Sequence, residues 1–289
     1  MYTTDPWTPP LALDLLKAVP DVDPATRFFL RCIHYLDLAG AGGWNPRWIA
    51  VVTFLVLGSI QRVCGKRYGI DWYALLHACV SSGGCLVMVY LNFTLSEPTT
   101  GYPEMLRSVR CGPPLTSLHR ILTAITMGYS LLDLSDGWHL GASFLVHGIA
   151  TFVVMAYYNE VGAPHMVAPM LLMEVSTVFL NLVKADFLNE TGVIVVQGLF
   201  AVTFFVFRLV VSPYLYIGLM IDFYREMDSN LFRSCRPQHL VYATGFGGFF
   251  YTVLNAYWFY RIVRKIQRKL SGREAVKGNN ELNENRKRQ

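Results

Sequence analysis

The sequence predicts an all-α, polytopic transmembrane helical bundle. The 289-residue chain is 53% hydrophobic and 16% charged, with a mean hydropathy of +0.34, whereas a soluble domain has about 25% charged residues. Its apolar residues gather in runs of about 20, the length that a helix needs to cross a bilayer. Lys and Arg are concentrated after the last run, as expected of a cytoplasmic segment beside a membrane.

The runs predict about seven spans, or six if the first, which is short, does not cross. The sixth is longer than one crossing requires, and Pro213 within it predicts a kink or a break, because proline has no amide hydrogen to donate. In chain order, we expect spans at residues 48–64, 73–93, 115–135, 138–158, 165–184, 193–221 and 239–261.

These spans form one domain, which we place at residues 47–268. In the preceding segment, 1–46, Asp23 as an N-cap and Pro24 in the first turn predict a short amphipathic helix. The segment 269–289 is basic and rich in Gly, Asn, Glu and Lys. We expect it to be a disordered cytoplasmic tail that contacts anionic headgroups. No basic-aromatic interleaving accompanies the charge, so we expect no nucleic-acid partner.

Basic residues predict the orientation of the bundle. Arg62, Lys66 and Arg67 follow the first span, and the basic tail follows the last, so both ends should be cytoplasmic. Asn92 begins an Asn-Phe-Thr sequon on the luminal side, which makes it a candidate for glycosylation. Cys111 and Cys235 lie in two loops that are both predicted to be luminal, and they are candidates for a disulfide.

Three ionisable residues lie within or at the end of apolar runs, where a charge is costly. They are Asp133, His147 and Glu174, and burying an Asp at a helix centre costs about 2.5–3.5 kcal/mol. At 1.5 Å per residue, His147 and Glu174 fall near the membrane midplane, with Asp133 nearer the cytoplasmic surface. We therefore expect a polar layer in the bundle.

This layer has three possible roles. His147 could act as a general base or in acyl transfer, with Asp133 as its partner; the group could hold a lipid headgroup or a proton path; or the residues could join helices by hydrogen bonds. Arg208 could pair with a carboxylate, hold a phosphate, or reach the interface. The other members of the expected polar core are Glu174, Ser176, Thr177, Asn181 and Asn255.

Two further expectations concern the rest of the membrane domain. Trp258, Phe259 and Tyr260 predict an aromatic belt at the membrane interface. No spacing of His, Cys, Asp and Glu is typical of a metal site, so we expect none.

Over residues 47–268 the chain resembles the TLC-domain family, which includes ceramide synthases and the translocating-chain-associating membrane protein. Residues 174–181 resemble the family's Glu-x-Ser-Thr-x-Phe-x-Asn stretch. The other stretches that carry the resemblance are Gly128-Tyr129 with Asp133, His147 in the next span, Phe205 to Pro213 with Arg208, and Leu254-Asn255 to Trp258-Phe259. Val146 stands where synthases have the first histidine of a pair, so the chain is closer to the non-synthase branch.

The resemblance implies a membrane protein of lipid homeostasis in the endoplasmic reticulum or another endomembrane, which binds or senses a lipid or acyl chain within its bundle. One alternative is a ceramide-synthase-like N-acyltransferase of sphingoid bases. Only this alternative would use acyl-CoA, and otherwise we expect no cofactor. Another is an adaptor for trafficking or assembly in the endoplasmic reticulum. The expected partners are membrane lipids, and formation of a homo- or hetero-oligomer is left open.

Overall fold

The computed structural model describes residues 45–95, 117–226 and 239–270, together with Pro24, Arg27, Phe28 and Arg31. Every regular element in these residues is a helix, which confirms the all-α prediction. The elements are α3 (Pro46–Cys64), η1 (Arg67–Gly69), α4 (Trp72–Leu95), α5 (Ser117–Leu140), α6 (Ala142–Glu160), α7 (Pro164–Val167), η3 (Ala168–Met173), α8 (Glu174–Leu182), α9 (Glu190–Phe204), η4 (Phe205–Val211), α10 (Ser212–Glu226) and α12 (His239–Leu270).

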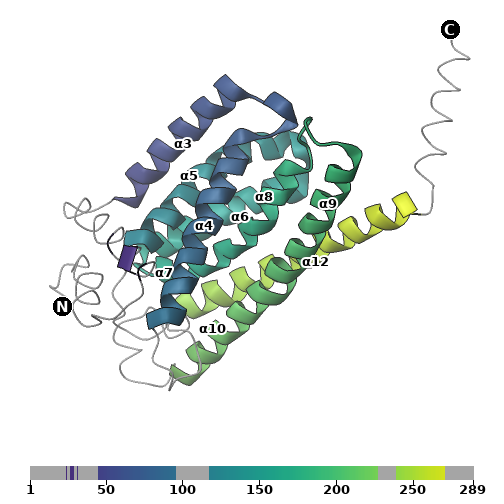
Figure 1. Cartoon of the computed structure of the whole chain (residues 1–289). Helices are drawn as coiled ribbons and strands as arrows, with labels where there is room; N and C mark the ends of the chain where they lie inside the picture. The colour runs from purple at the N-terminus through teal and green to yellow at the C-terminus, as the bar shows by residue number, and fades with distance from the viewer. Residues whose placement is uncertain are drawn as a thin grey trace, which may run out of the picture.

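The helices form a bundle (Figure 1). α5 packs between α3 and α6, and α4 packs against α8 and η3, while α12 lies along α10 and η4. Five helical stretches are long and apolar enough to cross a membrane: Pro46–Cys64, Arg67–Tyr90, Ala142–Glu160, Pro164–Leu182 and Glu190–Arg225. The other two expected spans correspond to α5 and α12, which have 24 and 32 residues but are more polar. The chain is therefore a helical membrane bundle.

Pro213 does not break its helix. α9, η4 and α10 form one 36-residue stretch, Glu190–Arg225, and the seven-residue π-helical segment η4 immediately precedes α10, which carries Pro213 in its first turn. Proline lacks an amide hydrogen and clashes with the carbonyl four residues earlier, so a wider turn before it removes the conflict. This segment also carries Arg208.

Two turns at one end of the bundle hold α4 beside α8. The amide of Asp186 donates to the carbonyl of Tyr68 at 2.8 Å, and Lys184 Nζ lies 3.0 Å from Asp71 Oδ2. A Cβ at Gly69, where φ is +73°, would lie 2.0 Å from the carbonyl oxygen of Lys184, so only glycine fits. These contacts fix the register of the two helices that carry His77 and Glu174.

Gly128 sets the separation of α3 and α5. A Cβ at this position would lie 2.4 Å from the carbonyl oxygen of Ala50 and 2.8 Å from Cβ of Thr53. Such contacts cannot form without moving one backbone away from the other.

We therefore predict that Gly128→Ala destabilises the protein by about 1–3 kcal/mol, the usual cost of overpacking. Gly83→Ala in α4 is the matched control, because nothing lies within 4 Å of a Cβ there and alanine favours a helix by up to about 1 kcal/mol. Thermal unfolding in detergent measures both. Equal unfolding midpoints for the two variants would contradict the close α3–α5 contact.

Candidate functional site

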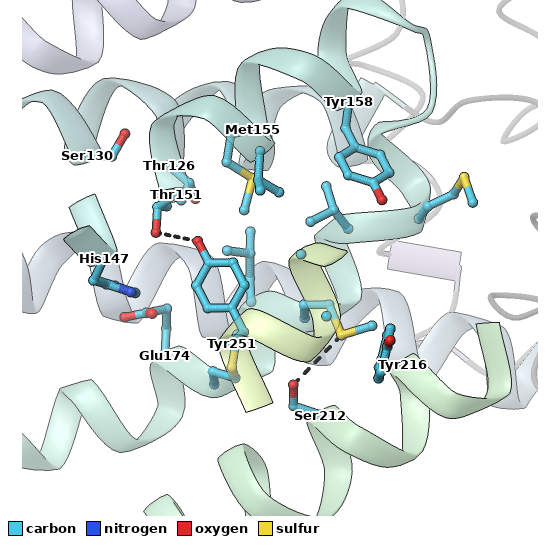
Figure 2. Close-up of a pocket in the computed structure, with 18 of the residues that line it drawn as sticks. Thr126, Ser130, His147, Thr151, Met155, Tyr158, Glu174, Ser212, Tyr216 and Tyr251 are labelled. Carbon is cyan, nitrogen blue, oxygen red and sulfur yellow. Dashed lines mark hydrogen bonds between the residues drawn. The ribbon is translucent and has the colours of Figure 1, made fainter. Parts of the chain in front are cut away.

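A cavity of about 80 Å³ lies inside the bundle, between residues of α4, α5, α6, α7, η3, α8, α10 and α12 (Figure 2). One end carries ionisable side chains, and the other combines methionines with the hydroxyl groups of Tyr158, Ser212 and Tyr216 (Figure 2). The polar end is formed by His77, Tyr129, Asp133, His147 and Glu174. The apolar side chains of the other end are Val154, Met155, Met166, Met170, Leu171 and Leu219.

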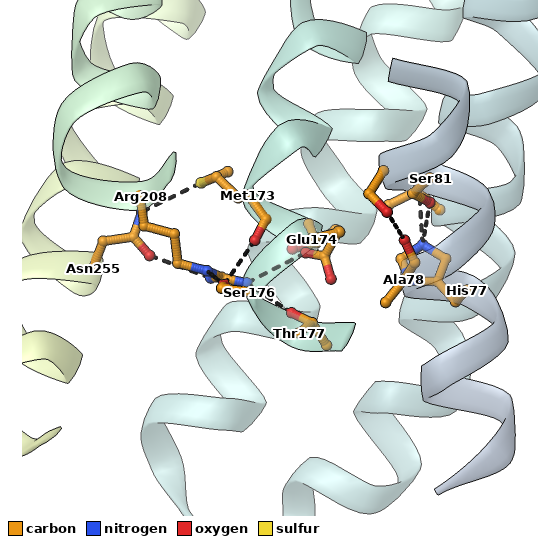
Figure 3. Close-up of polar contacts among 12 residues, drawn as sticks. His77, Ala78, Ser81, Met173, Glu174, Ser176, Thr177, Arg208 and Asn255 are labelled. Carbon is orange, nitrogen blue, oxygen red and sulfur yellow. Dashed lines mark hydrogen bonds and ion pairs between the residues drawn. The ribbon is translucent and has the colours of Figure 1, made fainter. Parts of the chain in front are cut away.

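Arg208 and Glu174 form a buried ion pair beside this cavity (Figure 3). Arg208 Nη2 lies 3.5 Å from Glu174 Oε1, with side chains that are 8% and 14% exposed. The guanidinium also donates to Ser176 Oγ at 2.9 Å, Thr177 Oγ1 at 3.0 Å and Asn255 Oδ1 at 3.4 Å. Five of the expected polar-core residues therefore meet at one point.

Local structure explains why these residues converge. η3 ends at Met173, so Glu174, Ser176 and Thr177 occupy the first turn of α8. Arg208 reaches them from the π-helical segment η4. Of the three roles considered for Arg208, its contacts are those of pairing with a carboxylate.

Aromatic rings complete the surroundings of the guanidinium. The Arg208 Cζ atom lies 5.3 Å from the ring centre of Phe204 and 5.9 Å from that of Trp258, within the range of cation–π attraction. Trp258 also contacts the His147 ring edge-on at 5.1 Å. Trp258 therefore packs against other helices, as does Phe259, which contacts Phe204 and Phe205, and the aromatic belt at the interface stays a prediction. Tyr260 is exposed.

His147 points into the polar end of the cavity, next to Glu174 (Figure 2). Its ring contacts Tyr251 and Trp258 edge-on, with centroid distances of 5.9 and 5.1 Å. Its Nδ1 atom is buried and has no hydrogen-bond partner within the described part of the chain. A buried polar atom without a partner is costly, so a hydrogen bond to this nitrogen would stabilise the site.

His77 of α4 is a second histidine at this end, and it was not among the residues predicted from the sequence. Its Nε2 atom lies 3.2 Å from Thr126 Oγ1 and 3.1 Å from Ser81 Oγ, and its ring stacks on Tyr129 at 3.8 Å. Its Nδ1 atom is also buried without a partner among the described residues. The signal that identified His147, an ionisable residue in an apolar run, applies equally to His77.

The two aspartates near the end of α5 have different surroundings. Asp133 lines the cavity and accepts a long hydrogen bond, 3.4 Å, from the hydroxyl of Tyr129. Asp136 accepts hydrogen bonds from Gln61 Nε2 at 3.1 and 3.2 Å and from the hydroxyl of Tyr73. Asp136 therefore joins α5 to α3 and α4, whereas Asp133 faces the site.

Asn181 does not join the group that the sequence analysis placed it in. It is buried, but its Nδ2 atom donates to the carbonyl of Thr177 within its own helix at 3.0 Å. Cys111 and Cys235, the segment 1–44 apart from the four residues named above, and the tail from residue 271 lie outside the described residues, as does the side chain of Asn92. Among the residues that are described, no three His, Cys, Asp or Glu side chains are grouped as metal ligands.

Breaking the Arg208–Glu174 pair should destabilise the fold, because the remaining charge stays buried without its partner. We predict that Arg208→Met and Glu174→Gln each lower the free energy of unfolding by about 3–5 kcal/mol, the usual cost of removing one partner from a buried ion pair. The double variant should cost less than the sum, because neither charge is left alone. Unfolding in detergent measures this cycle, with exposed Arg264→Met as the control. Additive losses would show that the two side chains act independently.

Comparison with known families assigns the chain to one of them. A family model described as the TLC domain matches residues 67–264, a range that contains the cavity and the ion pair described above. Comparison with curated proteins and with solved structures finds no match. Because the family model covers more than half of the chain, the protein belongs to the TLC-domain family of membrane proteins.

Proposed function

We propose that this protein binds a membrane lipid, or the acyl chain of one, inside its helix bundle and serves lipid homeostasis. The TLC-domain match supports a membrane protein of lipid metabolism or sensing. The observation that carries the finer proposal is the amphipathic cavity, which has carboxylates and histidines at one end and methionines at the other.

The two ends of the cavity fit the two parts of a lipid. His77, His147 and Asp133 offer hydrogen bonds to a headgroup. At the other end, Met155, Met166 and Met170 provide flexible, polarisable side chains that can adapt to a hydrocarbon chain. A volume of about 80 Å³ accepts only part of a chain, so we expect the methionines to move when a lipid binds.

The hydrogen bonds of the buried polar residues favour a binding site over a purely structural role. Residues that only join helices satisfy one another, as Arg208 does with Glu174, Ser176 and Thr177. His77 and His147 instead each leave one ring nitrogen buried without a partner in the described residues. Buried polar atoms are nearly always paired, and a ligand headgroup would supply the missing partner.

We infer an orientation in which the C-terminus is cytoplasmic, in the endoplasmic reticulum. Lys66 and Lys184 lie at the same end of the bundle, in contact with Asp71, and the basic end of α12 points toward that end (Figure 1). Basic residues favour the cytoplasmic side. The tail would then meet anionic headgroups there.

Filling the cavity should expel the lipid. A side chain at Gly247 would begin 3.9 Å from Val154 Cγ2, and both residues line the cavity. We predict that Gly247→Leu lowers the amount of lipid that co-purifies in mild detergent by about tenfold, measured by mass spectrometry. Gly83→Leu, where the space is open, should leave it unchanged. Equal lipid content in both variants, or no selected lipid in the unaltered protein, would overturn the proposal.

A second candidate is N-acyl transfer, which the unpaired Nδ1 atom of His147 beside Glu174 favours. His147 would accept a proton from the amine of a sphingoid base as the amine nitrogen attacks the thioester carbonyl of acyl-CoA and the thiolate leaves. The adaptor alternative depends on the tail and remains a prediction.

If the enzyme reading holds, purified protein given acyl-CoA and a sphingoid base forms an amide, and His147→Ala lowers the rate by about 100-fold or more. Asn181→Ala, outside the cavity, should retain activity and serves as the control. An absence of product with every acyl-chain length would exclude this reading and leave lipid binding standing.

A further inference from the structure

α12 is held closely against α10. A Cβ at Gly248 would lie 2.0 Å from Cδ2 of Tyr216, so the ring of Tyr216 occupies the space that glycine leaves open. The hydroxyl of Tyr216 donates to the carbonyl of Gly245 at 2.9 Å. Glycine contacts of this kind bring helices close together in membranes, so the α10–α12 interface resists separation.

The interface of α12 with α6 is different. Two hydroxyl pairs join the helices, Thr151 with Tyr251 at 2.8 Å and Tyr158 with Thr244. Beyond these pairs, ring contacts join the helices at both ends, between Trp258 and the rings of Phe144 and His147 and between His239 and Tyr157. Gly247 lies between them in the sequence of α12, and the nearest atom to a Cβ there is Val154 Cγ2 at 3.9 Å. The backbone of α12 runs closer to those of α10 and η4 than to that of α6.

This α6–α12 seam, formed by Thr151, Val154, Tyr158, Thr244, Gly247 and Tyr251, is also a wall of the cavity. All six residues line the cavity, and Figure 2 shows the hydroxyls of Thr151 and Tyr251 meeting across it. A small separation of α6 from α12 would therefore open the site sideways.

The faces of α6 and α12 that point away from the seam residues, by the 3.6-residue period of a helix, carry exposed apolar side chains. On α6, Ile149 and Val153 are 47% and 56% exposed. On α12, Phe246 and Phe249 are 75% and 64% exposed. In a bilayer such side chains face hydrocarbon, so the seam opens toward lipid tails rather than toward water.

We propose that the α6–α12 seam is a lateral portal, through which the tail of a lipid dissolved in the membrane passes into the cavity, with Thr151–Tyr251 and Tyr158–Thr244 as its latches. This inference rests on the proposed lipid binding, and it implies a ligand that enters from the bilayer. Interhelical hydrogen bonds in membranes are weak, which suits latches that open and close.

Locking the seam tests the portal. Tyr157→Cys with His239→Cys places two thiols across α6 and α12 beside the seam, at rings whose centres lie 5.8 Å apart and which do not line the cavity; a short, reducible bifunctional thiol reagent joins them. Gly58→Cys with Leu132→Cys is the matched control, because a Cβ at Gly58 lies 3.5 Å from Leu132 Cδ2, between α3 and α5. The probe is a palmitic acid with a diazirine in its chain, added to phosphatidylcholine vesicles that contain the protein.

Labelling of Met155 and Met166 in the cavity, located by mass spectrometry after brief illumination, is the measurement. We expect labelling to fall at least tenfold in the locked seam, to return after reduction, and to be unchanged in the control pair. The return after reduction shows that the variant is folded. Full cavity labelling of the locked protein would overturn the portal but leave lipid binding intact. No cavity labelling in the unaltered protein would overturn both.

Removing the hydroxyl pairs that close the seam should have the opposite effect on labelling from locking it. Thr151→Val with Thr244→Val keeps the shape of both side chains and removes the threonine hydroxyls. We expect labelling of the cavity to be about fivefold faster, the effect of losing two interhelical hydrogen bonds. Ser59→Ala, which removes a hydroxyl that bonds only within α3, should not change the rate. An unchanged rate in the latch variant would contradict the role of these pairs.

Discussion

The guanidinium of Arg208 is the group on which this bundle most depends. A charge in hydrocarbon requires partners, and Arg208 obtains them from two other helices: Glu174, Ser176 and Thr177 from α8, and Asn255 from α12. Meeting that requirement fixes α8, η4 and α12 relative to one another. Because Glu174 also lines the cavity, the interaction that holds the helices together forms part of the wall of the site.

Polar residues in this membrane domain therefore divide into two groups. The first, around Arg208, is satisfied internally and fixes the positions of helices. The second comprises His77, His147 and Asp133, which line the cavity. Nδ1 of each histidine has no hydrogen-bond partner among the described residues, and Asp133 accepts only a long hydrogen bond from Tyr129 in the described part of the chain. The distinction is physical, since an unpaired buried atom costs free energy that a bound headgroup would recover. Tyr157 and Trp258 also have a buried atom without a partner in the residues that the structure describes, but of these residues His77 and His147 line the cavity.

The sequence predicted the helices and much of the site, because the cost of burying charge identifies Asp133, His147, Glu174 and Arg208 without a structure. The sequence did not predict which of these residues join helices and which face the cavity, because that depends on side-chain contacts between distant helices. His77 was missed although the same criterion applied. Trp258 was assigned to the interface because an aromatic near a span end usually lies there, and its packing against His147 and Arg208 was not predicted. The π-helical segment also escaped prediction, since a proline alone does not distinguish a kink from a widened turn.

The position of α12 connects the ion pair to the proposed portal. Asn255 joins this helix to Arg208 and Gly248 packs it against Tyr216, and neither contact involves α6. Tyr251 lies between these features in sequence and contacts both Thr151 and His147. A headgroup that binds His147 would therefore press on the same side chain that latches the seam. Occupancy of the polar end and closure of the portal would then be coupled through Tyr251.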